Sequence, residues 1–499
     1  MSLARAVAWN TAVQVGGRAL GLIAAMAFTR IIVHDLGIET YGQFIAASAY
    51  VGLFMILGES GLYLVAVRRA MQEHERRSAI LGTALGLRLL WSVVPLGLAF
   101  VCAQLIPSER FPTYEPVVKL AIGILALNEY FRLLGQFLTA VFRMHLRMDL
   151  AIIGEVGSRF VALAGVLVVA ATGGGLLALA VAVTCASIVN LVYAWIVTRR
   201  FETFNPRLDR TLVRELVREA VVVAAVLVLS LLRGQLGTLL LSLLRSAEDV
   251  GIYGVAQKVH EVLISFPGLF IALLYPVFSR LAAEDREQLR RMFQRTFDVM
   301  LLASVAAALT VFVLAPQVAA ILGEPRAATP MRFLAFALPP VFLAMSFSHL
   351  LLAEGRQALI VRLYALLVAV NFTLHWIFIP RYSYLATASV NVVTEVLAMA
   401  SMGFYWIAVR RMRLQLRSLW SIPLAVVLGA ILLAGIRRWV PAEETSMTVR
   451  LVAVAASGLA TAGSYAGAVL GLRLVPMQLV RTLLPGTARP EGPASAEST

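Results

Sequence analysis

Apolar stretches of 20 residues or more recur along nearly the whole of this 499-residue chain. A helix of that length crosses the hydrocarbon core of a bilayer, which is about 30 Å thick. Hydrophobic residues make up 60% of the chain and charged residues only 14%, against about a quarter charged in soluble domains. With no long polar block to form a soluble domain, the sequence predicts an all-α polytopic membrane protein.

Hydropathy and connection lengths predict about 14 transmembrane helices, although 12 or 13 would also fit the pattern. The expected spans are residues 9–33, 43–67, 78–106, 117–142, 150–172, 176–198, 219–244, 255–279, 296–322, 330–353, 358–380, 384–408, 421–440 and 449–472. The first stretch is too long for the core of a cleaved signal peptide and is interpreted as a retained span.

Positive charge is placed in alternate connections between the spans. The net charge is +15, which by itself could indicate nucleic-acid binding. Arginines instead cluster after the even-numbered spans, as at Arg68–Arg69, Arg199–Arg200 and Arg410–Arg411. The positive-inside rule assigns these connections, and both termini, to the cytoplasm. We therefore expect a multi-pass protein of the bacterial inner membrane, with membrane lipids and no nucleic acid as partners.

An internal repeat is predicted from one offset near 212 residues. That offset overlays Tyr41-Gly42 on Tyr253-Gly254 and Arg68 on Arg280. Similar connection lengths could produce the same overlay by chance. The repeat predicts two six-helix lobes related by an axis along the membrane normal. The expected domains are 1–210, 211–420, two additional helices within 421–475, and a disordered cytoplasmic tail at 476–499.

Charged residues inside the spans must pair, snorkel or face water, because each costs about 2.5–3.5 kcal/mol at mid-depth in lipid. Three local pairs at helical spacing are expected to be ion pairs: Glu129 with Arg132, Glu155 with Arg159, and Lys258 with Glu261. For the first two we favour a structural role. Arg18, Arg88 and Arg233 are deep and have no local partner; they could pair across helices with Glu59 or Glu395, or line a cavity.

Arg18 continues a polar stripe on the first predicted helix. Asn10, Gln14 and Arg18 repeat every four residues and so share one face. Under the 212-residue overlay, Arg18 and Arg233 fall within about one helical turn of each other. We interpret these two arginines as opposite walls of one wet site; ordinary polar packing between helices is the competing interpretation.

Candidate ion-coupling groups are the acids Glu59, Glu261 and Glu395, with His260 as a candidate proton relay. A packing role is the alternative for His260. The six histidines show no metal-binding spacing, and no GxxxxGK[ST] phosphate loop is present. The sequence therefore predicts no cofactor, no metal site and no catalytic residue.

Short motifs carry a resemblance to a known family. Residues 246–258 read Ser-Ala-Glu-Asp-Val-Gly-Ile-Tyr-Gly-Val-Ala-Gln-Lys, and residues 275–280 read Tyr-Pro-Val-Phe-Ser-Arg. These segments resemble the Wzx-type polysaccharide flippases of the multidrug/oligosaccharidyl-lipid/polysaccharide superfamily. Residues 36–44 are similar to the first external loop of those flippases, and residues 57–62 to the glycine-rich end of their second helix. The helix layout of the whole chain agrees.

The resemblance implies two six-helix lobes around a cavity lined by helices one, two, seven and eight. It implies an undecaprenyl-diphosphate-linked oligosaccharide as substrate, for O-antigen, capsule or exopolysaccharide, with polymerases and glycosyltransferases as partners. In the related lipid II flippases, cavity arginines meet the diphosphate. On this basis Arg18, Arg233, Arg88 and Lys258, with Gln14 and Asn10, are the candidate substrate-binding residues.

Two other functions are compatible with such a chain. A multidrug cation exporter of the same superfamily would need unpaired acids in its cavity, whereas the deep unpaired residues here are mostly arginines. A membrane glycosyltransferase or polymerase would need an acid in a large external loop, whereas every predicted external loop is short. We therefore expect a transporter and not an enzyme.

Overall fold

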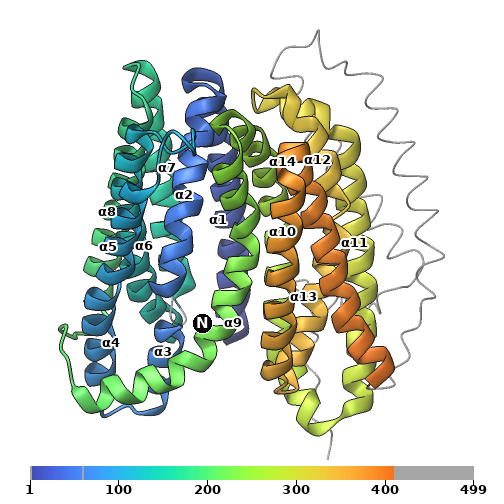
Figure 1. Cartoon of the computed structure of the whole chain (residues 1–499). Helices are drawn as coiled ribbons and strands as arrows, with labels where there is room; N and C mark the ends of the chain where they lie inside the picture. The colour runs from blue at the N-terminus through green and yellow to red at the C-terminus, as the bar shows by residue number, and fades with distance from the viewer. Residues whose placement is uncertain (1–2, 59–60, 146, 410–499) are drawn as a thin grey trace, which may run out of the picture.

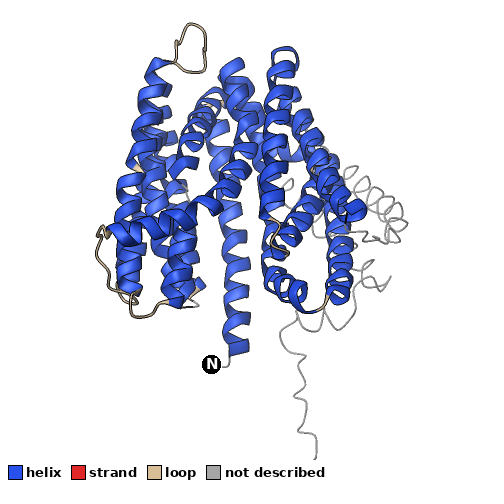
Figure 2. Ribbon diagram, turned by 60° about the horizontal axis from the view of Figure 1, so that its bottom comes forward, coloured by secondary structure: helices blue, strands red, loops and turns tan. Residues whose placement is uncertain are grey.

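The structure is a computed structural model that describes residues 3–58, 61–145 and 147–409. All regular secondary structure in these ranges is helical, as Figures 1 and 2 show. The last two predicted spans, 421–440 and 449–472, and the predicted tail lie outside the described residues, as does Glu59.

Five of the first six predicted spans coincide with helices, whereas the second, 43–67, is divided between α2, which ends at Gly58, and the separate helix α3, which begins at Leu62. The π-helical turn η1 continues α1, and α4 and α5 together form one span. The elements are α1 (Leu3–Ile31), η1 (Ile32–Leu36), α2 (Ile38–Gly58), α3 (Leu62–Gln72), α4 (Arg77–Trp91), α5 (Val93–Leu105), α6 (Pro116–Met144), α7 (Met148–Ala171) and α8 (Leu176–Thr198).

Six further predicted spans coincide with the helices of residues 210–409. The elements are α9 (Arg210–Leu244), α10 (Ala247–Glu284), α11 (Arg286–Ile321), η2 (Pro325–Ala327), α12 (Ala328–Ala335), α13 (Leu338–Ala353), α14 (Gln357–Phe404) and η3 (Tyr405–Val409). The chain breaks within α14 at Ser383, whose φ is 49° and ψ −132°. A side chain before the break contacts one after it, since Asn371 donates to the Thr394 hydroxyl over 3.2 Å. The chain therefore reverses direction at Ser383. The element α14 therefore contains two antiparallel spans.

Length and composition make the described helices suited to a bilayer. Among the residues described, seven helices could cross a membrane, or eight if the pair α12 and α13, bent by 45°, forms one span. Their outer faces carry exposed apolar side chains such as Ile23, Val168 and Ile196, as expected for lipid-facing surfaces. The protein is a multi-pass membrane protein.

The helices form two bundles, the first made of α1 to α8 and the second of α10 to α14, which meet along α2 and α10 (Figure 1). Glycines allow the first turns of these two helices to approach closely. A Cβ on Gly42 would lie 1.7 Å from the Ala247 carbonyl oxygen, and one on Gly251 would lie 2.4 Å from that of Ile38. Gly254 in turn packs against Tyr41. We call this contact, between residues 38–45 and 247–254, the seam.

The contacts of the seam are reciprocal. Gly42 of α2 packs on α10, while Gly254 of α10, its partner under the 212-residue offset, packs on α2. Tyr41 and Tyr253, the residues before them, are each 2% exposed. A two-fold relation between the helices would give this reciprocity. The division into repeated lobes nevertheless stays a prediction.

Helix α9 is attached to both bundles. Its first turns bury Leu212 and Leu216 against the cluster that contains α3 and α4, and Arg69 of α3 reaches Glu215 and Glu219 over 2.5 Å each. Its second half packs on α14, where a Cβ on Gly237 would lie 2.9 Å from the His375 ring. The helix therefore crosses from one bundle to the other without a break (Figure 1).

Candidate substrate cavity

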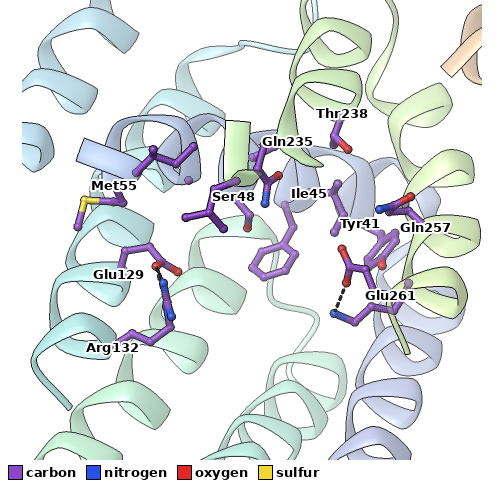
Figure 3. A pocket seen from close by; sticks show the side chains of 17 residues that line it. Tyr41, Ile45, Ser48, Met55, Glu129, Arg132, Gln235, Thr238, Gln257 and Glu261 are labelled. Atoms are coloured by element: carbon purple, nitrogen blue, oxygen red, sulfur yellow. Dashed lines mark hydrogen bonds and ion pairs between the residues drawn. The ribbon is translucent and has the colours of Figure 1, made fainter. Parts of the chain in front are cut away.

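A cavity of about 340 Å³ lies between α2, α6, α9 and α10. It extends from the seam toward the carboxyl end of α2. Its wall on α2 extends from Tyr41 to Ile56, a rise of about 22 Å along a helix at 1.5 Å per residue. Polar and charged side chains are interspersed with apolar ones (Figure 3). The charged residues that line it are Glu129, Arg132, Lys258 and Glu261.

One wall carries the pair on α6. Residues three apart lie on one helix face, and Nη2 of Arg132 lies 2.6 Å from Oε2 of Glu129. The Arg132 side chain is 50% exposed and that of Glu129 21% exposed. The guanidinium therefore contacts its acid and still presents open surface to the cavity.

The opposite wall carries the pair on α10 (Figure 3). Nζ of Lys258 lies 3.4 Å from Oε2 of Glu261, with side chains 36% and 48% exposed. Beside them the Tyr253 hydroxyl donates to Oε1 of Gln257 over 3.0 Å. This bond fixes Gln257, which also lines the cavity.

The cavity thus combines two bases and two acids in local pairs. A ligand with two negative charges could contact Arg132 and Lys258 together only by sharing them with Glu129 and Glu261. Bidentate contacts favour arginine for phosphate oxygens, while lysine acts as a point charge. The arrangement can hold an anionic group between the walls, with amide and hydroxyl side chains for further polar groups.

The predicted site residues are only partly brought together. Lys258 and Glu261 line the cavity. Arg233 instead forms a short ion pair with Glu395 of α14, and its guanidinium lies 5.5 Å from the centre of the Tyr364 ring. This pairing across helices is the alternative that the sequence left open. Neither partner is among the residues that line the cavity.

Arg88 and His260 lie away from the cavity. Arg88 is 1% exposed within α4. His260 is 5% exposed and faces α11 and α12, where it is surrounded by apolar side chains such as Leu263 and Leu334. The structure describes the backbone of α1 at Asn10, Gln14 and Arg18 but not these side chains.

Local pairing is confirmed for the three predicted pairs, including Glu155 with Arg159 at 2.7 Å. The α6 pair also lines the cavity, which sequence reasoning did not predict. The available signal was the position of Glu129 and Arg132 in the middle of a span, where a pair facing lipid would be costly. Gln235 and Thr238 of α9, noted only as polar neighbours of Arg233, also line the cavity.

Comparison with known families agrees with this architecture. The family model described as polysaccharide biosynthesis protein matches residues 3–282, more than half of the chain. This chain belongs to the polysaccharide biosynthesis protein family. A second model, MatE, matches residues 223–377. Both families are part of the multidrug/oligosaccharidyl-lipid/polysaccharide superfamily, whose members are transporters and flippases.

Solved structures of the superfamily share the fold of this family member. The lipid II flippase MurJ in an inward closed conformation aligns with a TM-score of 0.72 and 13% identity, covering 95% of this chain and 100% of that one. An inward-facing multidrug resistance MATE transporter aligns with a TM-score of 0.66 and 12% identity, covering 78% and 94%. A Vibrio cholerae MATE transporter gives 0.59 and 14%, covering 83% and 99%. No curated protein sequence matches significantly.

Proposed function

We propose that this polysaccharide biosynthesis family member is a flippase for an undecaprenyl-diphosphate-linked oligosaccharide in the bacterial inner membrane. The proposed transport proceeds by alternating access, outward from the cytoplasmic leaflet, with both termini cytoplasmic. The observation that carries it is the cavity in which Arg132 and Lys258 present basic groups from opposite walls. Family membership and the fold support the transporter class.

The chemistry of the walls supports the proposed substrate class. A diphosphate is the charged part of such a lipid, and its desolvation is costly beside the apolar side chains of the cavity walls. Arg132 and Lys258 offset that cost, while Ser48, Gln235 and Gln257 offer hydrogen bonds to sugar hydroxyls. The proposed glycan is a precursor of O-antigen, capsule or exopolysaccharide. Glycosyltransferases and a polymerase are the proposed partners upstream and downstream.

Membrane potential supplies a driving force for this direction. The cell interior is negative, and each negative charge moved outward gains about 2.3 kcal/mol per 100 mV. A diphosphate with two charges gains about twice that. Glu261, which lines the cavity, is the proposed site of any ion coupling among the candidate acids; Glu59, Glu395 and His260 are the other candidates.

The seam supports an inward-facing arrangement. The first turns of α2 and α10 pack backbone against backbone there, which closes the cavity at the end remote from the arginine-rich connections. In alternating access the two bundles would rock about the cavity and separate the seam. Substrate would therefore enter from the cytoplasmic leaflet in the arrangement described.

The test is translocation of a labelled lipid-linked oligosaccharide in proteoliposomes. Arg132→Ala combined with Lys258→Ala should abolish transfer between leaflets while the protein stays folded. A matched control is Arg159→Ala, which removes a paired arginine on α7 that does not line the cavity. Full transfer by the double variant would exclude the cavity as the diphosphate site. Arg18→Ala combined with Arg233→Met and Glu395→Leu, which leaves no buried charge without its partner, tests the site predicted from the sequence in the same assay.

A multidrug cation exporter is the second candidate, because Glu129 and Glu261 place carboxylates on the same walls. In this chain both acids are paired with bases, which makes them poorer cation sites. Export of a lipophilic cation that requires Glu261, without transfer of the lipid-linked oligosaccharide, would favour this candidate.

A further inference from the structure

A polar pocket and an apolar groove meet on the first bundle, away from the central cavity. The polar pocket, of about 500 Å³, is lined by Ser78 of α4, by Arg199 at the end of α8 and by the following loop, including Arg207. The groove, of about 340 Å³, is lined by leucines of α4, α6 and α8 together with Val192, Trp195 and Pro206. We call them the arginine pocket and the leucine groove.

The two spaces are continuous along the helices. On α8, Leu191 and Trp195 of the groove are followed four residues later by Arg199 of the pocket, so all three share one face. In the loop, Pro206 lines the groove and the next residue, Arg207, lines the pocket. A single molecule with a polar head and an apolar chain could therefore occupy both.

Backbone contacts fix the loop that carries Arg207. The amide of Arg207 donates to the Gly82 carbonyl over 3.1 Å, and the Ser78 hydroxyl donates to that of Thr203 over 3.2 Å. A Cβ on Gly86 would lie 2.4 Å from the Arg207 carbonyl oxygen. The loop thus lies directly on the glycine face of α4, and the pocket is formed by the fold.

Charge in the arginine pocket is positive and uncompensated. Within the described residues, Arg199 and Arg207 form no ion pair, and no carboxylate lines the pocket. The nearest acids in sequence are already used: Glu202 pairs with Arg77 at 2.9 Å, and Asp209 accepts from the first amides of α9. The Arg199 guanidinium lies 4.6 Å from the Trp195 ring centre, which favours its place at the mouth of the groove.

The leucine groove is shaped for a hydrocarbon chain. Its floor is buried, with Leu85 at 3%, Leu134 at 6% and Leu138 at 1% exposed, whereas Val192 at its edge is 49% exposed. A soluble phosphate would use only the pocket and would leave this apolar surface uncovered. Occupancy of the groove requires a ligand that carries an alkyl chain.

We propose that the arginine pocket and the leucine groove together bind one anionic glycerophospholipid from the leaflet on the arginine-rich side. Arg199 and Arg207 hold its phosphate and anionic headgroup, and one acyl chain lies in the groove beside Trp195. This site is separate from the central cavity, and the proposal does not depend on what the cavity transports.

Fluorescence quenching of Trp195 in proteoliposomes tests this proposal. The full chain is placed in vesicles with brominated acyl chains on either phosphatidylglycerol or phosphatidylcholine at equal mole fraction. The signal of Trp195 is the difference between the wild-type protein and Trp195→Phe. We expect stronger quenching by the anionic lipid. Each basic residue near a membrane surface contributes about fivefold to binding of anionic lipid, so Arg199→Ala with Arg207→Ala should abolish the preference.

The matched control is Arg200→Ala with Arg214→Ala, which removes the same charge from the same end of the protein without touching the pocket. The ratio of quenching by the two lipids, measured within each variant, should stay at the wild-type value in this control. Equal quenching by both lipids in the wild-type protein would overturn the proposal. An equal fall of the quenching ratio in both double variants would also overturn it. So would displacement of the brominated lipid by a polyprenyl diphosphate but not by unlabelled phosphatidylglycerol.

Discussion

Arg233 and Glu395 form an ion pair that joins α9 to α14 inside the second bundle. Their side chains are 18% and 10% exposed, and Tyr364 covers the guanidinium. Removing one partner of a buried pair strands the other charge, which costs about 3–5 kcal/mol, whereas replacing both by apolar residues is often neutral. The pair therefore stabilises the packing of α9 only while both members are present.

Glu395→Gln alone should lower the thermal midpoint of the purified protein, because Arg233 keeps its charge in a buried site. Arg233→Met combined with Glu395→Leu should recover most of that loss. Unfolding in detergent, followed by size-exclusion chromatography after heating, measures both. If the double variant is as unstable as the single one, the pair has a role that charge balance does not explain.

At the scale of elements, the first turns of α2 and α10 pack closely at the seam, and the proposed function requires this contact to open. Gly251→Val would place a side chain against the Ile38 carbonyl, at 2.4 Å for its Cβ alone. The first turns of the two helices should then separate. A cysteine at Ser48, which lines the cavity, should become accessible to a membrane-impermeant thiol reagent added from outside.

Gly157→Val provides the comparison for that experiment, because no heavy atom lies within 4 Å of the Cβ position of Gly157 on α7. Cysteine labelling at position 48 should stay at the background level in this variant. Labelling that is unchanged by Gly251→Val would show that the seam does not seal the cavity.

At the scale of the whole molecule, α9 links the bundles through contacts at both of its ends. Arg69 donates to Oε1 of Glu219 over 2.8 Å and Arg68 donates to its Oε2 over 2.5 Å, so this carboxylate accepts from two guanidinium groups. Arg69 is 19% exposed and contacts two carboxylates. Its loss should therefore cost more than the 0.2–1 kcal/mol that is typical of a single exposed pair.

Glu215→Gln with Glu219→Gln should release the first turns of α9 from α3 and slow transport several-fold without unfolding the protein. Proteoliposome transfer measures the rate, and a disulfide between cysteines introduced in α3 and α9 reports the contact. Glu287→Gln, which removes an exposed partner of Arg291 on α11, should change neither. A normal rate after loss of the contact would mean that α9 does not couple the bundles.

The whole-molecule layout follows from sequence more readily than the cavity does. Twelve spans up to residue 409 could be placed because apolar length and arginine position act within single helices. The partner of Arg233 depends on how α9 packs against α14, which no local pattern encodes. For the same reason the Glu129–Arg132 pair was recognised as a pair, but its place in the cavity wall was not, because that depends on helices far apart in the chain.

The seam also determines the order of events as the chain is made. The end of α2 leaves the ribosome about 225 residues before the end of α10, which at 5–20 residues per second is roughly 10–45 s. For that time Gly42 and the small residues beside it have no α10 to pack against. Nascent α2 must therefore wait in the bilayer against lipid or against its own bundle, and any truncation before Ala247 leaves this face permanently bare.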